Sequence, residues 1–420
     1  MKQGGKGINI IGYTEGKFGL GEAVRLNIKA IESQNISFNL IDFEKMKRNP
    51  NYTFNVNFSV NLIQISLGDL DTFFRLIDPE LFKFKYSILF LMWESEYIPS
   101  KFTKNLNLFN EIWTASTFCR NVFKKVYNNP ISVIPHPIEF KLNGVNDIKK
   151  KKYFDETKFS FLFIFSYHSS IERKNPFFLI DAFSKAFNDS DEVELIIKTV
   201  GAERFKKESS FLIKKVALYK HIKIYNVDLD KNNTNHLINS CDCYVSMHHS
   251  EGFGLTMAEA MFFGKPTIAT NYSGNTQFMN HENSYLVDSE IGLIKTTDKN
   301  FGPNTIWGHP KMEDAILKMQ KVYKNKEDRK HKALNAENFI KKELSFKSIG
   351  LLIKNRFDIA YEESKDLISN ENAYLVSELQ FLKVENAHLK REIHRMKKNL
   401  VIRFMIFIKN KVRMIKNRLK

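Results

Sequence analysis

The stretch SEGFGLTMAEAMFFGKPTIAT (residues 250–270) places two glutamates, Glu251 and Glu259, on either side of a turn that contains glycine. Gly252 and Gly254 lack Cβ atoms, so a ligand can approach the backbone of this turn closely. The turn runs into an apolar segment, a change that predicts a loop followed by a helix. A glycine-bearing loop in front of a helix start is a candidate ligand site.

The spacing of Thr256 and Glu259 fits a capping box and predicts a helix from about Thr256 to Phe263. A glycine and a proline end that helix, and residues 266–272 are predicted to form the next strand. The free N–H groups and partial positive charge at such a helix start suit a phosphate or sugar phosphate. Capping explains Glu259 but not Glu251, which we expect in a solvated cleft, where it can meet a ligand.

The length of 420 residues predicts two to three domains, and the 43% hydrophobic content is enough for their cores. Cys119, Cys241 and Cys243 form no disulfide framework, which indicates a reducing, cytoplasmic compartment. The first residues contain no long apolar run, so we expect no signal peptide. No apolar stretch approaches the roughly 18–20 residues that a membrane-spanning helix needs.

The formal net charge of +17 is concentrated at the C-terminus. Residues 383–420 contain 13 Lys or Arg and only two Glu. The charge is therefore mainly a property of the tail, and it does not indicate a nucleic-acid-binding core.

Short apolar strands alternate with helical segments in two successive series. The first series begins with GINIIGY (7–13), a glycine-rich loop and a helix, and the second begins with FSFLFIFS (159–166). A charged stretch at 146–158 separates them. We therefore predict an α/β protein with two doubly wound domains that face each other across a cleft, with ligands at the carboxyl ends of the strands.

These features resemble the family-4 glycosyltransferases, which retain anomeric configuration and have the GT-B fold of two Rossmann-like domains. The resemblance covers roughly residues 7–362. The motifs that carry it are GLGEAVR (19–25), WESEYIPS (93–100), NEIWTASTF (110–118), VIPHPI (133–138), RKNP (173–176), LIIK (195–198), SEGFGLTMAEAMFFGKPTIAT (250–270), SGNTQFM (273–279) and NSYLV (283–287).

The resemblance predicts an acceptor-side domain at residues 1–145 and a nucleotide-sugar-binding domain at 146–362, whose last helix can cross back to the first domain. It implies that Glu251 contacts the hydroxyls of the donor sugar and that Glu259 holds the ribose of the nucleotide. The backbone amides around four residues of the turn would meet the sugar and diphosphate. These four residues are Gly252, Phe253, Gly254 and Leu255.

Lys174 resembles the lysine that binds the diphosphate in this family. Many relatives have an arginine six residues earlier, where this sequence has His168. Arg173 and Lys198 are the two candidates for the missing second cation. Either would stabilise the charge that grows on a departing nucleoside diphosphate.

On the acceptor side, Gly19 and Gly21 resemble the loop that approaches the diphosphate and the acceptor. Glu94 stands where many relatives have a histidine near the reacting sugar, so it is a candidate catalytic residue together with Glu251. His136, between two prolines, is open to a structural or a functional interpretation.

No metal and no cofactor are expected. Asp228 and Asp230 have the D-x-D spacing that binds metal in the other large transferase fold, GT-A, but we interpret them as a surface turn after a strand. His248 and His249 lack a third ligand at a suitable spacing. Retaining enzymes of this family are thought to react on one face of the sugar, with the departing phosphate accepting the acceptor's proton, so no dedicated nucleophile is expected.

The resemblance predicts transfer of a hexose from a nucleotide-sugar donor to a glycan or lipid-linked glycan, as in the synthesis of bacterial-type surface polysaccharides. A sugar-nucleotide epimerase or a phosphorylase of the same fold is the first alternative. A non-catalytic protein that binds nucleic acid through its basic tail is the second, although we expect no nucleic-acid partner.

Residues 363–400 are predicted to form a coiled coil, because 368–400 repeat every seven residues. Ile368, Leu375, Leu382, Leu389 and Met396 occupy one core position, and Asn372, Leu379, Asn386, Ile393 and Leu400 occupy the other. Glutamates and lysines at the flanking positions would pair across a parallel homodimer. A single helix packed on the body is the alternative.

Residues 401–420 contain seven Lys or Arg, no acid and one apolar helical face. This pattern predicts an amphipathic helix on an anionic membrane surface. We therefore expect a cytoplasmic protein attached peripherally to the inner face of the membrane.

Overall fold

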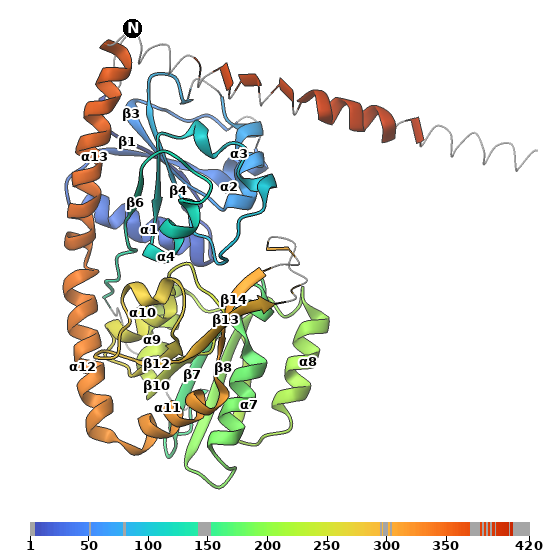
Figure 1. Ribbon diagram of the computed structural model, residues 1–420, viewed down its shortest axis with the longest axis vertical. Coiled ribbons are helices and arrows are strands. Elements are labelled where there is room, and N and C mark those ends of the chain that lie inside the picture. The colour runs from blue at the N-terminus through green and yellow to red at the C-terminus, as the bar shows by residue number, and fades with distance from the viewer. Residues whose placement is uncertain are drawn as a thin grey trace, which may run out of the picture.

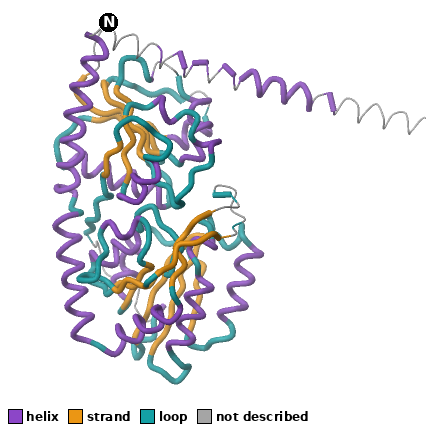
Figure 2. Tube along the Cα trace, in the orientation of Figure 1, coloured by secondary structure: helices purple, strands orange, loops and turns teal. Residues whose placement is uncertain are grey.

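The computed structural model contains two α/β units, which we call the N-terminal half and the C-terminal half (Figure 1). Their strands form two separate groups, each flanked by helices (Figure 2). The structure describes residues 5–49, 52–78, 81–141, 153–294, 296, 301–302 and 305–369, and separate positions between 379 and 405.

The N-terminal half is built on six parallel strands in the order β2-β1-β3-β4-β5-β6. Both faces of β3 are buried, as expected for a parallel sheet that is covered on two sides. The strands are β1 (Gly5–Gly12), β2 (Phe38–Asp42), β3 (Phe58–Gln64), β4 (Tyr86–Phe90), β5 (Glu111–Thr114) and β6 (Ile131–Val133).

The C-terminal half repeats this arrangement with six parallel strands in the order β12-β11-β10-β7-β8-β9. The predicted strand 159–166 is confirmed as β7, and its interior residues are buried on both faces. The strands are β7 (Phe159–Ser166), β8 (Val193–Val200), β9 (Ile222–Asn226), β10 (Cys243–Ser246), β11 (Thr267–Thr270) and β12 (Tyr285–Val287).

Each sheet has a topological switch point, where the chain reverses the direction in which it adds strands. In the N-terminal sheet this point lies between β1 and β3, and in the C-terminal sheet it lies between β7 and β10. Ligands of open α/β sheets bind outside the carboxyl ends of the strands at such points. The loops after β7 and β10, which carry Arg173, Lys174 and Glu251, are therefore neighbours at this position.

Helices cover both faces of the two sheets (Figure 1). Those of the N-terminal half are α1 (Gly19–Glu32), α2 (Phe43–Arg48), α3 (Leu70–Leu76) and α4 (Thr117–Phe123). The later helices are α6 (Ile171–Lys174), α7 (Pro176–Ala186), α8 (Lys206–Val216), α9 (Lys231–Ser240), α10 (Leu255–Phe262), α11 (Met312–Lys324), α12 (Lys326–Glu343) and α13 (Phe346–Ser369).

The last helix returns to the N-terminal half, where α13 packs against α1, β3 and β4. Arg356 on α13 donates two hydrogen bonds to the buried carboxylate of Glu111, at 2.7 and 3.1 Å. The chain crosses between the halves twice at one edge, where Ile138 N–H donates to the carbonyl of Leu344 at 2.6 Å. The helices α12 and α13 run along that edge (Figure 1).

A two-stranded antiparallel hairpin, β13 (Ser289–Ile294) and β14 (Thr305–Pro310), follows β12. It belongs to the C-terminal half by sequence, yet Phe301 and Trp307 are buried in the hydrophobic core of the N-terminal half. The sequence did not predict this hairpin. It connects the two halves away from the α12–α13 crossing.

The two halves meet directly at the glycine turn, so the predicted cleft is closed at that point. Ser116 Oγ donates to the carbonyl of Gly252 at 2.8 Å, and the amide of Thr117 donates to Gln277 Oε1 at 2.9 Å. A Cβ atom on Gly252 would lie 2.9 Å from Met92 Cβ, so glycine permits this close approach. The structure therefore has a closed boundary at the glycine turn.

The described part of the tail is helical at 392–400, and the apolar side chains there are exposed. A coiled coil is not shown, and much of the predicted heptad segment and most of 401–420 lie outside the described residues. Across the described helices, none is both long enough and apolar enough to cross a bilayer.

Candidate functional site

The glycine turn bends sharply into α10. Gly254 has φ +99°, a conformation that favours glycine, and it forms the N-cap of the helix. The predicted capping box is wrong, because α10 begins at Leu255, no side chain caps it and Thr256 lies inside its first turn. Glu259 is instead buried and pairs with Lys231 on α9.

Neighbouring backbone and side-chain groups fix the position of Glu251. Its amide donates to Ser273 Oγ at 2.8 Å, and its carbonyl accepts from the amide of Gly274 at 2.8 Å. Gly274 packs so tightly that an added Cβ would lie 2.2 Å from the Gly252 carbonyl oxygen. The segment after β11 therefore supports the glycine turn from behind.

Arg173 and Lys174 end the short helix α6, whose first turn is capped by Ser170. Asn175 follows with φ +55°, a left-handed conformation that asparagine tolerates, and its side chain donates to the carbonyl of Met247 at 2.9 Å. This bond ties the loop after β7 to the loop after β10. It brings both cations to Glu251.

Glu251 lies between the two cations. Arg173 Nη1 is 3.0 Å from Glu251 Oε2, and the ammonium of Lys174 pairs with Oε1. Burial alone would raise the pKa of Glu251, but Lys174 and Arg173 outweigh it and lower this pKa to about 2. The expectation of a solvated Glu251 is wrong, because the residue is only 8% exposed and is held as a buried carboxylate.

Glu94 reaches this cluster from the opposite half. It follows β4, and its Oε1 lies 3.8 Å from Arg173 Nη2. Two cations and two carboxylates from both halves thus meet at the boundary. The structure places Glu94, Arg173, Lys174 and Glu251 together, four residues that the sequence nominated separately.

Glu259 occupies a second charged position. The ammonium of Lys231 pairs with its Oε1 and lies 3.9 Å from Glu22 on α1. Burial raises the pKa of Glu259, although Lys231 opposes the shift. Glu259 Oε2 is buried and has no hydrogen-bond partner within the described part of the chain. This oxygen therefore retains an unused capacity to accept a hydrogen bond.

The remaining nominated residues have surroundings of their own. Gly19 and Gly21 are in the first turn of α1, and an added Cβ on Gly21 would lie 2.1 Å from the Gly16 carbonyl oxygen. Lys198 is buried on β8, where burial lowers its pKa and Asp228 is its charged neighbour. Of the two candidates for the second cation, Arg173 is therefore the one that contacts Glu251.

The side chains of the turn face the protein interior. Phe253 is buried and its ring lies 5.2 Å from that of His136 and 5.0 Å from that of Phe278. Leu255 packs beside the same core. His168 contacts Phe205 and Gly201 and does not occupy the place of a phosphate-binding arginine at Glu251. The turn can therefore offer its backbone, not its side chains, to a ligand.

Two buried histidines, His136 and His248, and the partly buried His249 lie near the boundary. Burial lowers the pKa of His136 to about 3 and those of His248 and His249 to about 4, so all three are neutral near pH 7. His248 bonds Ser246 and Asn275, at 3.1 Å each. Within the described residues, no group of three or more His, Cys, Asp or Glu side chains could hold a metal ion.

Asp228 and Asp230 follow β9. Asp230 caps α9 by accepting from the amide of Asn233 at 2.7 Å. This second acid of the D-x-D sequence therefore has a structural role at the start of a helix.

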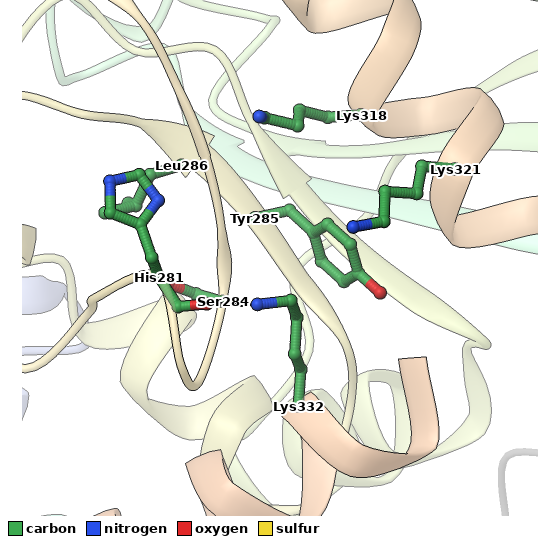
Figure 3. A pocket seen from close by; sticks show the side chains of 7 residues that line it. All are labelled: His281, Ser284, Tyr285, Leu286, Lys318, Lys321 and Lys332. Atoms are coloured by element: carbon green, nitrogen blue, oxygen red, sulfur yellow. Dashed lines mark hydrogen bonds between the residues drawn. The ribbon is translucent and has the colours of Figure 1, made fainter. Parts of the chain in front are cut away.

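A cavity of about 230 Å³ lies elsewhere on the C-terminal half (Figure 3). Its lysines already have partners: Lys318 pairs with Asp314, and Lys321 pairs with Asp328, at 3.3 Å each. Lys332 donates to the carbonyl of His281. None of the nominated site residues lines this cavity, so we place the functional site at the boundary between the halves.

Sequence reasoning missed Lys231, Ser273 and Trp307. Ser273 lies in a recognised motif and has φ +75°, an unusual backbone for a non-glycine residue, but the sequence does not reveal that angle. Lys231 and Trp307 reach the site only through tertiary contacts. No local pattern distinguishes them from other lysines and tryptophans.

One comparison with known proteins matches part of the C-terminal half. Residues 146–296 match the family described as glycosyl transferases group 1, and this match contains Arg173, Lys174, Glu251 and Glu259. No curated protein matches the sequence.

Solved structures with the same fold include a protein from Anabaena, Alr3699/HepE in complex with UDP and glucose. It has 14% identity and a TM-score of 0.61, over 84% of this chain and 100% of that one. A glycosyltransferase from Rickettsia africae has 15% identity and a TM-score of 0.60, over 84% and 98%. Sucrose-phosphate synthase from Thermosynechococcus elongatus has 12% identity and a TM-score of 0.60, over 85% and 99%.

At these identities the solved structures show the fold, which is GT-B. The family match covers the part of the C-terminal half that carries the glycine turn and its cations. The chain therefore has the GT-B fold, and its residues 146–296 are similar to the group 1 glycosyl transferases.

Proposed function

We propose that this protein is a glycosyltransferase that moves a hexose from a nucleotide sugar to a glycan or lipid-linked glycan, with retention of anomeric configuration. One observation carries the proposal: Glu251 lies between Arg173 and Lys174 at a glycine turn, with Glu94 of the other half opposite. Carboxylates accept hydrogen bonds from sugar hydroxyls, and the cations bind phosphate oxygens. One site can thus bind both the sugar and the diphosphate of a nucleotide sugar.

The donor would bind where the boundary is now closed. Its diphosphate takes Arg173 and Lys174 as partners, with the free N–H groups at the start of α10 in front of it. Glu251 then turns from neutralising the cations to accepting hydrogen bonds from the sugar. Gly252 and Gly254 admit the sugar against the backbone.

The nucleoside would lie toward Glu259. The unpartnered Oε2 of this residue can accept a hydrogen bond from a ribose hydroxyl, while Lys231 holds the other oxygen. UDP is the first nucleotide to test, because the structurally similar Anabaena protein is described in complex with UDP and glucose. Glu22 places α1 of the N-terminal half beside the same position.

In the reaction, the bond between the anomeric carbon and the phosphate oxygen breaks, and the acceptor hydroxyl oxygen bonds to that carbon on the same face. The hydroxyl proton passes to the departing phosphate oxygen. Arg173 and Lys174 stabilise the charge on the nucleoside diphosphate, and they do so most effectively in a closed, water-poor site. Glu94 lies on the N-terminal half, at the side from which the acceptor would come.

The tail sequence supports two further parts of the proposal, the location of the protein at a membrane and its dimerisation. Residues 368–400 would pair with a second copy through their heptads, since Leu382, Leu389 and Met396 are exposed in the single chain. Residues 401–420 would hold the enzyme on the inner face of an anionic membrane, near a lipid-linked acceptor used in surface polysaccharide synthesis. The tail's charge serves this surface and not nucleic acid.

The test uses the full-length protein and a panel of UDP-, GDP-, ADP- and dTDP-hexoses. We expect one donor to be hydrolysed slowly, to release its nucleoside diphosphate faster when a glycan acceptor is added, and to raise the melting temperature. Glu251→Gln should lose both release reactions. A panel in which no nucleotide sugar is turned over or stabilises the protein would contradict the proposal.

A further inference from the structure

The hairpin formed by β13 and β14 joins the two halves beside the site. Its buried residues Phe301 and Trp307 pack in the core of the N-terminal half, although the strands follow β12 of the C-terminal half. The ring of Phe301 lies 5.2 Å from that of Trp93 and 5.3 Å from that of Trp307. The docked hairpin therefore reaches the residue next to Glu94.

The indole N–H of Trp307 donates to the backbone carbonyl of Glu94. This bond fixes the backbone of a segment that has no regular secondary structure. Trp93, in the same segment, donates its indole N–H to the carbonyl of Tyr97 at 2.9 Å. The position of the Glu94 carboxylate therefore depends on a residue from the opposite half.

His249 connects the hairpin to the cations. Its ring stacks on Trp307, with centroids 6.0 Å apart and planes 9° apart, and its Nδ1–H donates to the carbonyl of Gly308 at 2.8 Å. The backbone amide of His249 donates to the carbonyl of Arg173 at 2.8 Å. A chain of contacts thus connects Arg173 to Glu94 through His249 and Trp307. Glu94 and Arg173 also contact each other directly, as an ion pair of 3.8 Å.

We propose that the β13–β14 hairpin is a positioning element of the transfer reaction, which through Trp307 and His249 holds Glu94 of one half against Arg173 of the other. This inference rests on the proposed function, since it gives Glu94 and Arg173 their place in the reaction. Docking of the hairpin on the N-terminal half therefore also aligns the Glu94 carboxylate with the Arg173 guanidinium. Trp307 is a positioning residue, because its contact is with the Glu94 backbone and not with the reacting atoms.

The test replaces Trp307 by Phe, which keeps a buried ring and removes the N–H donor. Trp113→Phe is the matched control, because Trp113 is also buried in the N-terminal half and its indole N–H has no partner among the described residues. The readouts are kcat and KM for donor turnover, calorimetric binding of UDP, and amide hydrogen exchange of peptides that cover 91–98.

For Trp307→Phe we expect kcat to fall about tenfold, the scale of one lost buried hydrogen bond. UDP affinity should stay within about twofold, since the nucleoside position around Glu259 is untouched, and exchange at 91–98 should rise. Trp113→Phe should change none of these quantities. Phe301→Leu loosens the docking of the hairpin, so it should also lower kcat and raise exchange at 91–98. It replaces Trp307→Phe in the test if that variant does not fold.

Equal kcat and equal exchange at 91–98 in Trp307→Phe and Trp113→Phe would overturn the inference. So would a loss of UDP binding together with kcat in Trp307→Phe, which would show general damage to the site. If the wild-type enzyme turns over no donor, the proposed function fails, while faster exchange at 91–98 in Trp307→Phe alone still supports the positioning contact.

Discussion

Arg173 and Glu251 form an ion pair of 3.0 Å in which the two side chains are only 7% and 10% exposed. Buried ions need partners, because removing one leaves an uncompensated charge away from water. The same pair is expected to bind the donor. Substitutions here will therefore affect both folding stability and turnover, and the two effects have to be measured separately.

Glu251→Gln should abolish donor turnover and also lower the free energy of unfolding. Breaking a buried pair costs about 3–5 kcal/mol, and the amide recovers part of this by accepting one hydrogen bond. Glu290→Gln is the control, because Glu290 is 77% exposed in its pair with Lys311 and should change stability by no more than about 1 kcal/mol. Denaturant unfolding and turnover measure the two quantities, and a fully active Glu251→Gln enzyme would remove this residue from the site.

Stability should fall as the pH drops from 6.5 toward 4, because the buried histidines stay neutral in the folded state. Burial lowers the pKa of His136 from 6.5 to about 3, so below pH 6.5 the unfolded chain binds a proton that the folded chain does not. His136→Gln should flatten the decline, whereas exposed His331→Gln should not. Melting temperatures between pH 4 and 8 test this, and identical slopes for all three proteins would show that His136 does not control it.

Lys231 should determine the pH below which nucleotide binding weakens. Burial raises the pKa of Glu259 and Lys231 opposes this, so Lys231→Met should raise that pKa further and leave Glu259 protonated at a higher pH. A rise of one unit corresponds to about tenfold weaker binding of the ribose by ionised Glu259 below that pKa. Calorimetry with UDP at pH 5 to 8 measures it. Lys231→Arg should retain the wild-type profile, and a Met variant that does the same would contradict the role of Lys231.

Charge at the heptad core should give monomers with intact donor binding. Leu382 and Leu389 are exposed in the single chain, so Leu382→Asp with Leu389→Asp would prevent their burial in a dimer without disturbing the body. Val384→Asp, outside the core positions of the heptad, is the control. Light scattering after size exclusion gives the mass, and a wild-type mass equal to one chain would rule out the coiled coil as a dimerisation element.

Truncation after Leu400 should release the protein from anionic vesicles. The segment 401–420 contains seven Lys or Arg, each worth about 1 kcal/mol near an anionic surface, together with an apolar face. High salt should weaken attachment only in part, since apolar burial is not screened. Transfer to a small soluble acceptor should be unchanged and transfer to a lipid-linked one reduced. Equal co-sedimentation of the full-length and truncated proteins would mean that the tail has another partner.

The parallel strands were predictable because they are short and largely apolar, and central strands such as β3 and β7 are buried on both faces. The glycine turn was recognisable because its residues are contiguous in the sequence. The hairpin was not predicted, because β13 carries the exposed side chains Ile291 and Leu293 and its buried partners lie in the other half. Tertiary packing decides that segment, and no local periodicity records it.

Pairing of charges was the least predictable part of the site. The capping-box spacing of Thr256 and Glu259 suggested a local bond, but Gly254 already bends the chain into α10 and Lys231 takes the carboxylate. Glu251 was expected in a solvated cleft because no local feature explained it, and its partner Lys174 lies 77 residues away in the sequence. A sequence shows which residues carry charge but not which charges meet.

The return of α13 to the N-terminal half determines which half would be held if the tail were attached to a membrane. Lys6, near the start of the chain, pairs with Asp358 on α13 at 3.1 Å, and Arg356 anchors the same helix to Glu111. A membrane or partner that holds the tail would therefore hold the N-terminal half. The C-terminal half, which carries the proposed donor site, would then be the moving body, and it would swing toward an N-terminal half that is already fixed in place.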